Sequence, residues 1–231
     1  YPNQRDSDIV TRIIAGYATY GLVPDVTQTS ESPPETERIT TQQGTDLAFV
    51  QQLAARNSFI FYVEPTDAPT VNRAYWGQEN RRGQRQPALT MNMGSHTNVD
   101  QISFGFNVLD PVTPQVTIIE PLTGMAIPVP VPDLPLPSLT SRPARPLRTT
   151  VPRDTANLNL IQAALRALSA VSESAEAAMA KGVLDAVRYG RALRPRRLVD
   201  LRGAGQTHDG TYYVKQVTHR IKRGEYKQDF T

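Results

Sequence analysis

Prolines restrict what the middle of this chain can fold into. Eight of the 19 prolines fall between residues 128 and 152. Because proline has no backbone N–H to donate, a segment with a proline every few residues cannot form a central strand of a sheet. Residues 133–156 are therefore expected to be a Pro-rich arm, either an extended, partly polyproline-like surface segment or a disordered linker.

Residues 7–93 carry the pattern of a compact α+β domain. Apolar residues recur every three to four positions over Asp8–Tyr20, which predicts a helix. A second helix is expected to begin at Thr45 or Asp46, because either side chain can cap its first turn. Strands are expected in four short β-prone runs, Arg38–Thr41, Phe59–Val63, Ala74–Trp76 and Ala88–Met91.

Residues 94–132 and 157–231 flank the arm. Val99–Asp110 and Gln115–Ile119 read as two strands, and side chains of the first alternate between two faces. Apolar residues at helical spacing in an alanine-rich context predict the longest helix of the chain over Asn157–Lys181, with Gly182 as its stop.

The end of the chain has the pattern of a β-hairpin. Side chains over Tyr212–Ile221 alternate in character, as in one strand with two different faces. Arg223-Gly224 follows with turn chemistry, and Tyr226–Thr231 resumes an extended pattern. We expect Gly224 to set the register of the hairpin.

Charge is distributed unevenly along the chain. From Lys181 to the end there are 12 Lys and Arg and 5 Asp and Glu, a balance of +7, whereas the remainder has 13 against 17, a balance of −4. Such a division is typical of a contact with an acidic partner or with nucleic acid, and also of a solvated basic face.

The sequence predicts no catalytic, metal or cofactor site, and therefore a protein that is not an enzyme. It has no cysteine, which excludes disulfides and thiolate chemistry, and its three histidines lie outside any metal-binding spacing. No Gly-x-Ser-x-Gly motif is present, and no pair of carboxylates has the spacing of a glycosidase.

No membrane segment is expected, because no apolar run approaches the ~18 residues of a transmembrane helix. The first residues lack the layout of a signal peptide. The chain begins at Tyr1 without a methionine, so we expect an upstream part of the protein to be missing.

Arginines concentrate in a short segment near the C-terminal tyrosines. Arg188, Arg191, Arg194, Arg196 and Arg197 fall within ten residues. With nearby tyrosines as stacking platforms, a basic β-barrel would suit single-stranded nucleic acid. Arginines that alternate with leucine and valine also suit a half-buried strand at a protein interface. The spacing alone does not separate these two interpretations.

Two strings carry a family resemblance. YGRALRPRRLVDLRGAG…DGTYYVKQVTHRIKRGEYKQDF, from Tyr189 to Phe230, resembles the C-terminal barrel of phage late control D proteins. These are the central baseplate hubs of contractile phage tails and contractile injection systems, and are related to VgrG spike proteins. GTDLAFVQQLAARNSFIFYVE, from Gly44 to Glu64, is similar to the helix and strand of hub and VgrG-like proteins. Ser58 stands where the family usually has glycine, and Asn57 is expected to take the left-handed conformation instead.

The resemblance implies an α+β fold with small β-barrel hub domains, an inserted α+β domain and one long amphipathic helix. Residues 7–93 would be the inserted domain. Residues 94–132 would supply strands of a truncated first barrel, with its opening strands upstream of Tyr1. Residues 157–231 would form the helix and the second barrel.

The resemblance also implies a structural function, that of a hub which adapts the sixfold tail tube to the threefold spike. The expected partners are two further copies in a homotrimer, the tail tube protein, the spike protein and other baseplate components. The expected location is the baseplate of a virion or injection particle, assembled in the bacterial cytoplasm. A nucleic-acid-binding β-barrel protein is the alternative.

Eight residues are expected at the interfaces of such a hub, without a membrane or a cofactor. They are mostly basic or aromatic and lie in the C-terminal segment: Arg188, Tyr189, Arg194, Arg196, Arg197, Tyr212, His219 and Lys222.

Overall fold

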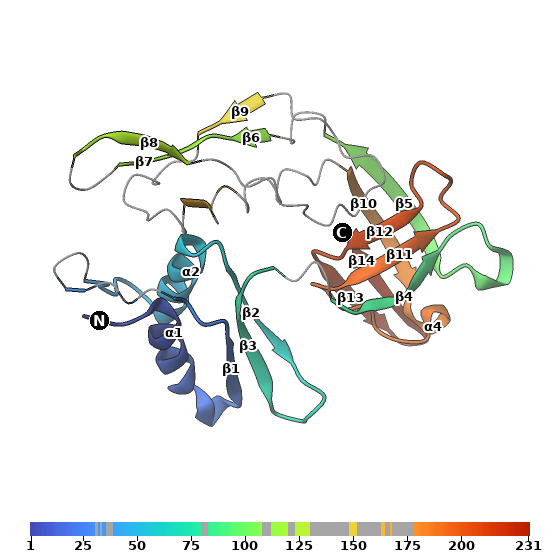
Figure 1. The fold of residues 1–231 in the computed structure, drawn as a ribbon. Helices are drawn as coiled ribbons and strands as arrows, with labels where there is room; N and C mark the ends of the chain where they lie inside the picture. Colours follow the sequence, from blue (N-terminus) through green and yellow to red (C-terminus); the bar gives the residue numbers. More distant parts are fainter. Residues whose placement is uncertain are drawn as a thin grey trace. The chain divides into compact units, whose positions relative to one another are not determined.

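The computed structural model divides into two compact units, Tyr1–Glu79 and Asn80–Thr231 (Figure 1). It describes residues 1–30, 32, 34–35, 39–79, 83–107, 112–119, 123–129, 148–151, 163–164, 167 and 178–231. Most of the expected Pro-rich arm, residues 133–156, lies outside these ranges.

The first unit is a three-stranded mixed sheet with helices on one face (Figure 1). Its helical segments are α1 (Asp6–Ala15), η1 (Ala18–Tyr20) and α2 (Asp46–Arg56), and its strands are β1 (Leu22–Val26), β2 (Ile60–Pro65) and β3 (Asn72–Gly77). β3 is central, pairing parallel to β1 and antiparallel to β2. The fully buried Trp76 packs edge-on against Phe59, with ring centroids 4.7 Å apart, and anchors the core between helices and sheet.

Local signals predicted much of this unit. The Thr45 side chain accepts a hydrogen bond from the Ala48 amide and caps α2, as expected. The strand expected at Arg38–Thr41 is wrong, because its described residues, 39–41, are not in a strand. The left-handed conformation expected at Asn57 is also wrong, because Ser58 has φ of +56° and Asn57 has φ of −91°.

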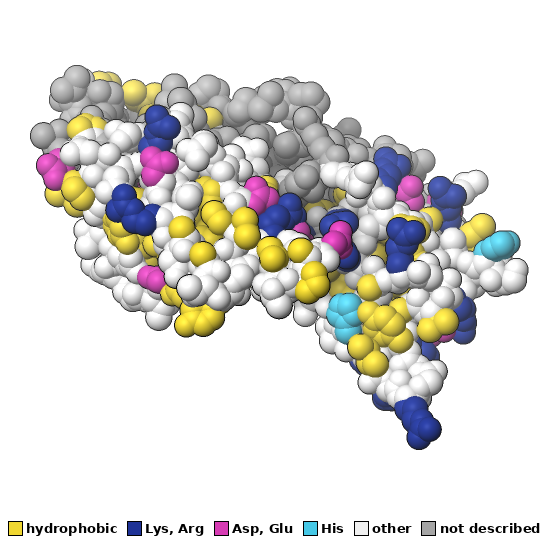
Figure 2. Space-filling view, turned by 90° about the horizontal axis from the view of Figure 1, so that it is seen from below, with side chains coloured by type: hydrophobic (Ala, Val, Ile, Leu, Met, Phe, Trp, Pro, Cys, Tyr) yellow, Lys and Arg dark blue, Asp and Glu magenta, His cyan; other side chains and the backbone are white. Residues whose placement is uncertain are grey.

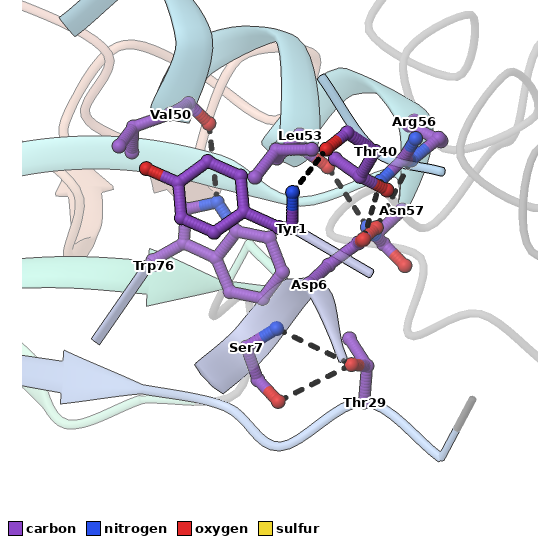
Figure 3. Close-up of polar contacts among 10 residues, drawn as sticks. All are labelled: Tyr1, Asp6, Ser7, Thr29, Thr40, Val50, Leu53, Arg56, Asn57 and Trp76. Atoms are coloured by element: carbon purple, nitrogen blue, oxygen red, sulfur yellow. Dashed lines mark hydrogen bonds and ion pairs between the residues drawn. The ribbon is translucent and has the colours of Figure 1, made fainter. Parts of the chain in front are cut away.

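A buried carboxylate joins α1 to the end of α2 (Figure 3). Asp6 is 3% exposed at the start of α1. It accepts hydrogen bonds from Arg56 Nε at 3.0 Å and from Asn57 Nδ2 at 2.6 Å, and a second Arg56 nitrogen completes a two-pronged ion pair. Arg56 also reaches Thr40 Oγ1. The two helices are thus fixed to each other by a charged contact beside the apolar core.

The second unit has two sheets that share one core. The first has the strand order β13-β14-β10-β5 and the second β12-β11-β4. Their bounds are β4 (Arg85–Thr90), β5 (Val99–Phe106), β10 (Ala178–Asp185), β11 (Leu198–Arg202), β12 (Gly210–Tyr213), β13 (Val217–Lys222) and β14 (Glu225–Phe230). Short helical segments lie at η2 (Gly94–His96) and α4 (Ala186–Tyr189). Both sheets contribute to the core, including Leu184 and Phe230 from one and Leu89, Val199 and Leu201 from the other.

The expected α+β class with β-barrel domains is wrong. Strands predominate over helices in the part of the chain that the structure describes, and its sheets are open and mixed, with no closed barrel. The ladder does not close, because β13 and β5 are the ends of one sheet and β12 and β4 the ends of the other. β4 pairs with β11 and β5 with β10, so these early strands complete the sheets of the C-terminal segment.

The long helix expected over Asn157–Lys181 does not extend to its expected end. Ala163, Ala164 and Ala167 are helical, but Ala178–Asp185 is the strand β10. Gly182, expected to stop the helix, lies inside β10 and pairs with Phe230 on one side and Ile102 on the other. Burial between two strands outweighs the helix propensity of this alanine-rich segment.

Four short strands form two further ladders. β6 (Val112–Pro114) pairs parallel to β9 (Arg148–Thr150), and β7 (Val116–Ile119) pairs antiparallel to β8 (Ala126–Val129). The strand expected at Gln115–Ile119 is therefore confirmed. Val116 and Val129 pack with Ala163 and Ala167 in a small cluster of their own.

The final hairpin is confirmed. β13 and β14 pair antiparallel from Val217–Phe230 to Lys222–Glu225, around a turn in which Gly224 has φ of +80°. The single strand expected over Tyr212–Ile221 is wrong, because β12 ends at Tyr213 and β13 begins at Val217 in the other sheet.

Gly224→Val should destabilise the second unit by about 1–2 kcal/mol, because a β-branched residue in a left-handed conformation is strained. Chemical denaturation followed by circular dichroism would measure the loss. Lys222→Ala, in the same turn, should change the free energy of unfolding by less than about 0.5 kcal/mol, since an exposed side chain is removed. A neutral Gly224→Val would contradict the role of the turn in setting the register.

Candidate interaction surface

The arginine-rich segment forms a fixed loop between α4 and β11, here called the arginine loop (residues 190–197). Two glutamine side chains hold its backbone as strand partners would. Gln228 of β14 accepts from the Leu193 amide at 2.8 Å and donates to the Leu193 carbonyl at 3.0 Å. Gln86 of β4 makes the same pair of bonds with Arg194, at 2.8 and 2.9 Å. Leu193 is fully buried in the core of the second unit, and its side chain anchors the loop there.

The rest of the loop is held by backbone bonds to one residue beyond β12. The Arg196 amide donates to the Val214 carbonyl at 2.7 Å, and the Val214 amide donates to the Arg197 carbonyl at 3.0 Å. Arg196 has φ of +60°. Arg194 is exposed, and Arg196 and Arg197 are half-buried. The three arginines are therefore presented from a rigid backbone.

The neighbouring expected residues have structural contacts of their own. Arg188 on α4 forms ion pairs with Asp100 and Asp185, each at 3.3 Å. The Tyr189 hydroxyl donates to the Pro87 carbonyl at 2.7 Å, and the Tyr212 hydroxyl donates to the His208 carbonyl at 2.8 Å. Burial raises the pKa of Tyr189 to about 12 and also raises the pKa of Tyr212.

His219 and Lys222 lie on β13. The His219 ring is stacked on Tyr226, and its Nδ1 lies 2.7 Å from the Tyr226 hydroxyl and 3.4 Å from Gln228 Nε2. Gln228 therefore touches both β13 and the arginine loop. Lys222 is at the end of the hairpin, 3.9 Å from Glu225.

The fold matches solved phage tail structures. The structural likeness to the tail protein from Neisseria meningitidis MC58 has a TM-score of 0.64 at 13% sequence identity and covers 99% of this chain and 66% of that one. The 43 kDa tail protein of prophage MuSo2 from Shewanella oneidensis gives 0.61 at 15% identity and covers 100% and 64%. A chain in the virion of a native gene transfer agent particle gives 0.50 at 14% identity and covers 98% and 46%.

These similarities establish the fold of the chain. The chain spans slightly less than two thirds of the length of the two tail proteins. No protein-family model and no curated protein sequence matches it.

Metal sites and membrane-spanning helices each require a feature that the described residues lack. In the described ranges, no three His, Cys, Asp or Glu side chains are grouped so that they could hold a metal ion. No helix there is long and apolar enough to cross a membrane. On the face shown in Figure 2, the Lys and Arg side chains stand in separate groups, several of them beside Asp or Glu side chains.

Sequence reasoning missed the two glutamines that shape the arginine loop. Gln86 and Gln228 are 142 positions apart in the numbering. Gln228 lies within the Tyr189–Phe230 string, but nothing in that string marks it as a partner of the loop. Gln228 is fully buried although it is polar, because both ends of its amide are bonded to Leu193. Only the pairing of β14 with β10 and of β4 with β11 places them beside the loop.

The burial of Tyr189 predicts a loss of stability at high pH. Its hydroxyl ionises at pH 10 in the ordinary case and at about 12 in the fold. The folded state holds this proton more tightly, so its contribution is complete below pH 10 and is lost as the pH rises to 12. The free energy of unfolding should fall by up to about 1.4 kcal/mol per pH unit in this window. Tyr189→Phe should fall less steeply by chemical denaturation, and equal slopes would contradict the assignment.

Proposed function

We propose that this chain is part of a structural baseplate hub of a contractile phage tail or injection system, where it adapts the sixfold tail tube to the threefold spike. The observation that carries the proposal is the fold match over 98–100% of the chain to two tail proteins and one virion protein. The resemblance of Tyr189–Phe230 to late control D hubs supports the narrower assignment. The function is mechanical and involves no catalysis.

In this proposal the protein is a homotrimer in the baseplate, assembled in the bacterial cytoplasm with tube, spike and other baseplate proteins. The unit Tyr1–Glu79, which makes up most of residues 7–93, is the inserted domain. The two sheets of Asn80–Thr231 are the part that builds the ring. The charge division supports this arrangement, because the first unit has 5 basic and 10 acidic residues and the second has 20 and 12.

The arginine loop is the proposed contact of the ring. The loop backbone, held by Gln86 and Gln228, loses little freedom on binding, which favours a specific protein contact. Single-strand binding would need exposed aromatic rings beside the cations. Tyr189 is only 7% exposed, and the Tyr212 hydroxyl is bonded within the unit. Because Tyr189 is buried and Tyr212 packs against the core, neither of these two tyrosines offers a free ring for stacking, which favours a protein partner over nucleic acid.

Light scattering on the protein as its genome encodes it tests the proposal. We expect three times the mass of one chain, and threefold particles by negative-stain electron microscopy. Arg194→Glu combined with Arg197→Glu should shift the trimer to monomer, because reversed charges at an interface repel their former partners. Arg12→Glu is the control, because Arg12 is exposed on α1 in the first unit, and it should leave the mass of the trimer unchanged.

Two outcomes would contradict the proposal. A stable monomer at high protein concentration would exclude a trimeric hub. Submicromolar binding to single-stranded DNA at about 150 mM salt, with affinity falling steeply as salt rises, would favour the nucleic-acid-binding alternative.

A further inference from the structure

The inner face of the β13–β14 hairpin continues past the core. Val217 pairs with Phe230, His219 with Gln228, and Ile221 with Tyr226, so these three pairs lie on one face of the sheet. The first pair packs in the core. Along the hairpin the face becomes uncovered, and Ile221 at its end is 73% exposed.

The uncovered part of this face is rigid. His219 and Tyr226 are stacked with ring centroids 5.9 Å apart, and Gln228 ties the same face to the arginine loop. An apolar side chain beside a fixed aromatic pair is typical of a contact surface, because little side-chain entropy is lost when a partner covers it.

The hairpin also offers an open backbone edge. β13 is the end strand of its sheet, and none of the described strands pairs with its outer edge. In the antiparallel ladder, Gln216 exchanges both bonds with Thr231, so bonded and non-bonded pairs alternate from there. The amides and carbonyls of Val217, His219 and Ile221 therefore point to the open edge. Three residues whose backbone groups point away from β14, and which no described strand pairs with, are enough to receive a short added strand.

On the opposite face of the hairpin, the charged side chains of the edge strand β13 are both basic, whereas the carboxylates lie on β14. Arg220 and Lys222 lie on this face in β13, opposite Lys227 and Glu225. The two carboxylates of the hairpin are already paired, Asp229 with Arg220 at 2.5 Å and Glu225 with Lys227 at 3.1 Å. Lys227 also reaches Asp100 at 3.1 Å, and hydrogen bonds to the two carboxylates raise its pKa.

The positive charges of Arg220 and Lys222 favour a strand of another protein over a second copy of this chain at the edge of β13. If a second copy paired through β13, Arg220 and Lys222 of both copies would lie on the same face, and like charges across a strand pair are destabilising. A strand with carboxylates on that face would instead meet both cations. On the other face, the same strand would place apolar side chains against His219 and Ile221. Since side chains alternate between faces, the fitting sequence alternates apolar and acidic residues.

We propose that β13 is a docking edge for an extended segment of another protein, with alternating apolar and acidic side chains, which adds to the sheet as a fifth strand. The proposal does not depend on the hub function, because it rests on the edge, the face and the charges of the hairpin alone. In this proposal, the exposed Ile221 on one face of β13 and the cations Arg220 and Lys222 on the other face contact the same added strand.

The probe is a synthetic peptide of about eight residues that alternates valine and glutamate. Its binding to the full chain is measured by fluorescence anisotropy, against a peptide with lysine in place of glutamate and a peptide with the same residues in two blocks. We expect both control peptides to bind at least about tenfold more weakly. The amides of His219 and Ile221 should become protected from hydrogen exchange, because they point to the added strand.

Ile221→Ser should weaken binding about tenfold. Val187→Ser is the matched control, because Val187 on α4 is also 73% exposed but follows β10, across β14 from the open edge of β13, and it should have no effect. Failure of the valine–glutamate peptide to bind, equal binding of the lysine peptide, or equal effects of the two variants would overturn the proposal. Self-association of the chain that Ile221→Ser abolishes would also overturn it, in favour of a second copy at this edge.

Discussion

Asp6→Ala should lower the free energy of unfolding of the Tyr1–Glu79 unit by about 3–5 kcal/mol, because removing one partner of a buried ion pair leaves the other charge uncompensated. Asp6 is 3% exposed and accepts from both Arg56 and Asn57. Without it, Arg56 loses its carboxylate and Asn57 loses a 2.6 Å hydrogen bond between the two helices.

Trp76 provides a specific readout for this prediction. It is the only tryptophan in the chain and is fully buried in the core of the first unit, so its fluorescence during chemical denaturation reports that unit alone. Asp8→Ala is the control, because it removes an exposed carboxylate from the same turn of α1 and should cost less than about 0.5 kcal/mol. Equal losses for the two variants would show that the helix terminus, and not the buried pair, accounts for the effect.

Elements with a complete local signal could be predicted from the sequence. The cap of α2 needs only Thr45 and the amide three residues later, and the final hairpin needs only a glycine turn between two β-prone runs. Both are confirmed. β1 was not predicted, because its five residues include Pro24 and its parallel partner β3 lies about 50 positions later. Pro24 is tolerated there because β1 is an edge strand.

The candidate surface depends on contacts that no sequence pattern contains. The arginines were identifiable by composition, but their rigid presentation comes from Gln86 and Gln228, on strands distant in sequence. The sequence suggested that the neighbouring tyrosines could be exposed stacking platforms. Tyr189 is instead buried, and its hydroxyl donates a hydrogen bond to the Pro87 carbonyl. Burial is set by the pairing of the strands, so it could not be inferred from alternation along a single segment.

The strand β10 is a second case in which strand pairing could not be inferred from the local sequence. Its alanine-rich flank has a helical pattern, yet the segment is the central partner of β14 and β5. At Gly182 a Cβ would lie 2.6 Å from the Gln101 carbonyl oxygen and 2.6 Å from the Phe230 ring. Glycine is therefore required by the close approach of the neighbouring strand and ring, since Gly182 is not among the residues with positive φ.

Gly182→Val should therefore destabilise the second unit by about 3 kcal/mol, because the Phe230 ring can rotate away but the Gln101 backbone cannot move without opening the β10–β5 ladder. Gly105→Val in β5 is the matched control. It introduces the same side chain into the same sheet, where a Cβ would meet nothing within 4 Å, and it should change stability by less than about 0.5 kcal/mol. Urea denaturation followed by far-UV circular dichroism measures both. If Gly182→Val proves as mild as Gly105→Val, β10 is not packed between β5 and Phe230, and the helix expected from the sequence regains support.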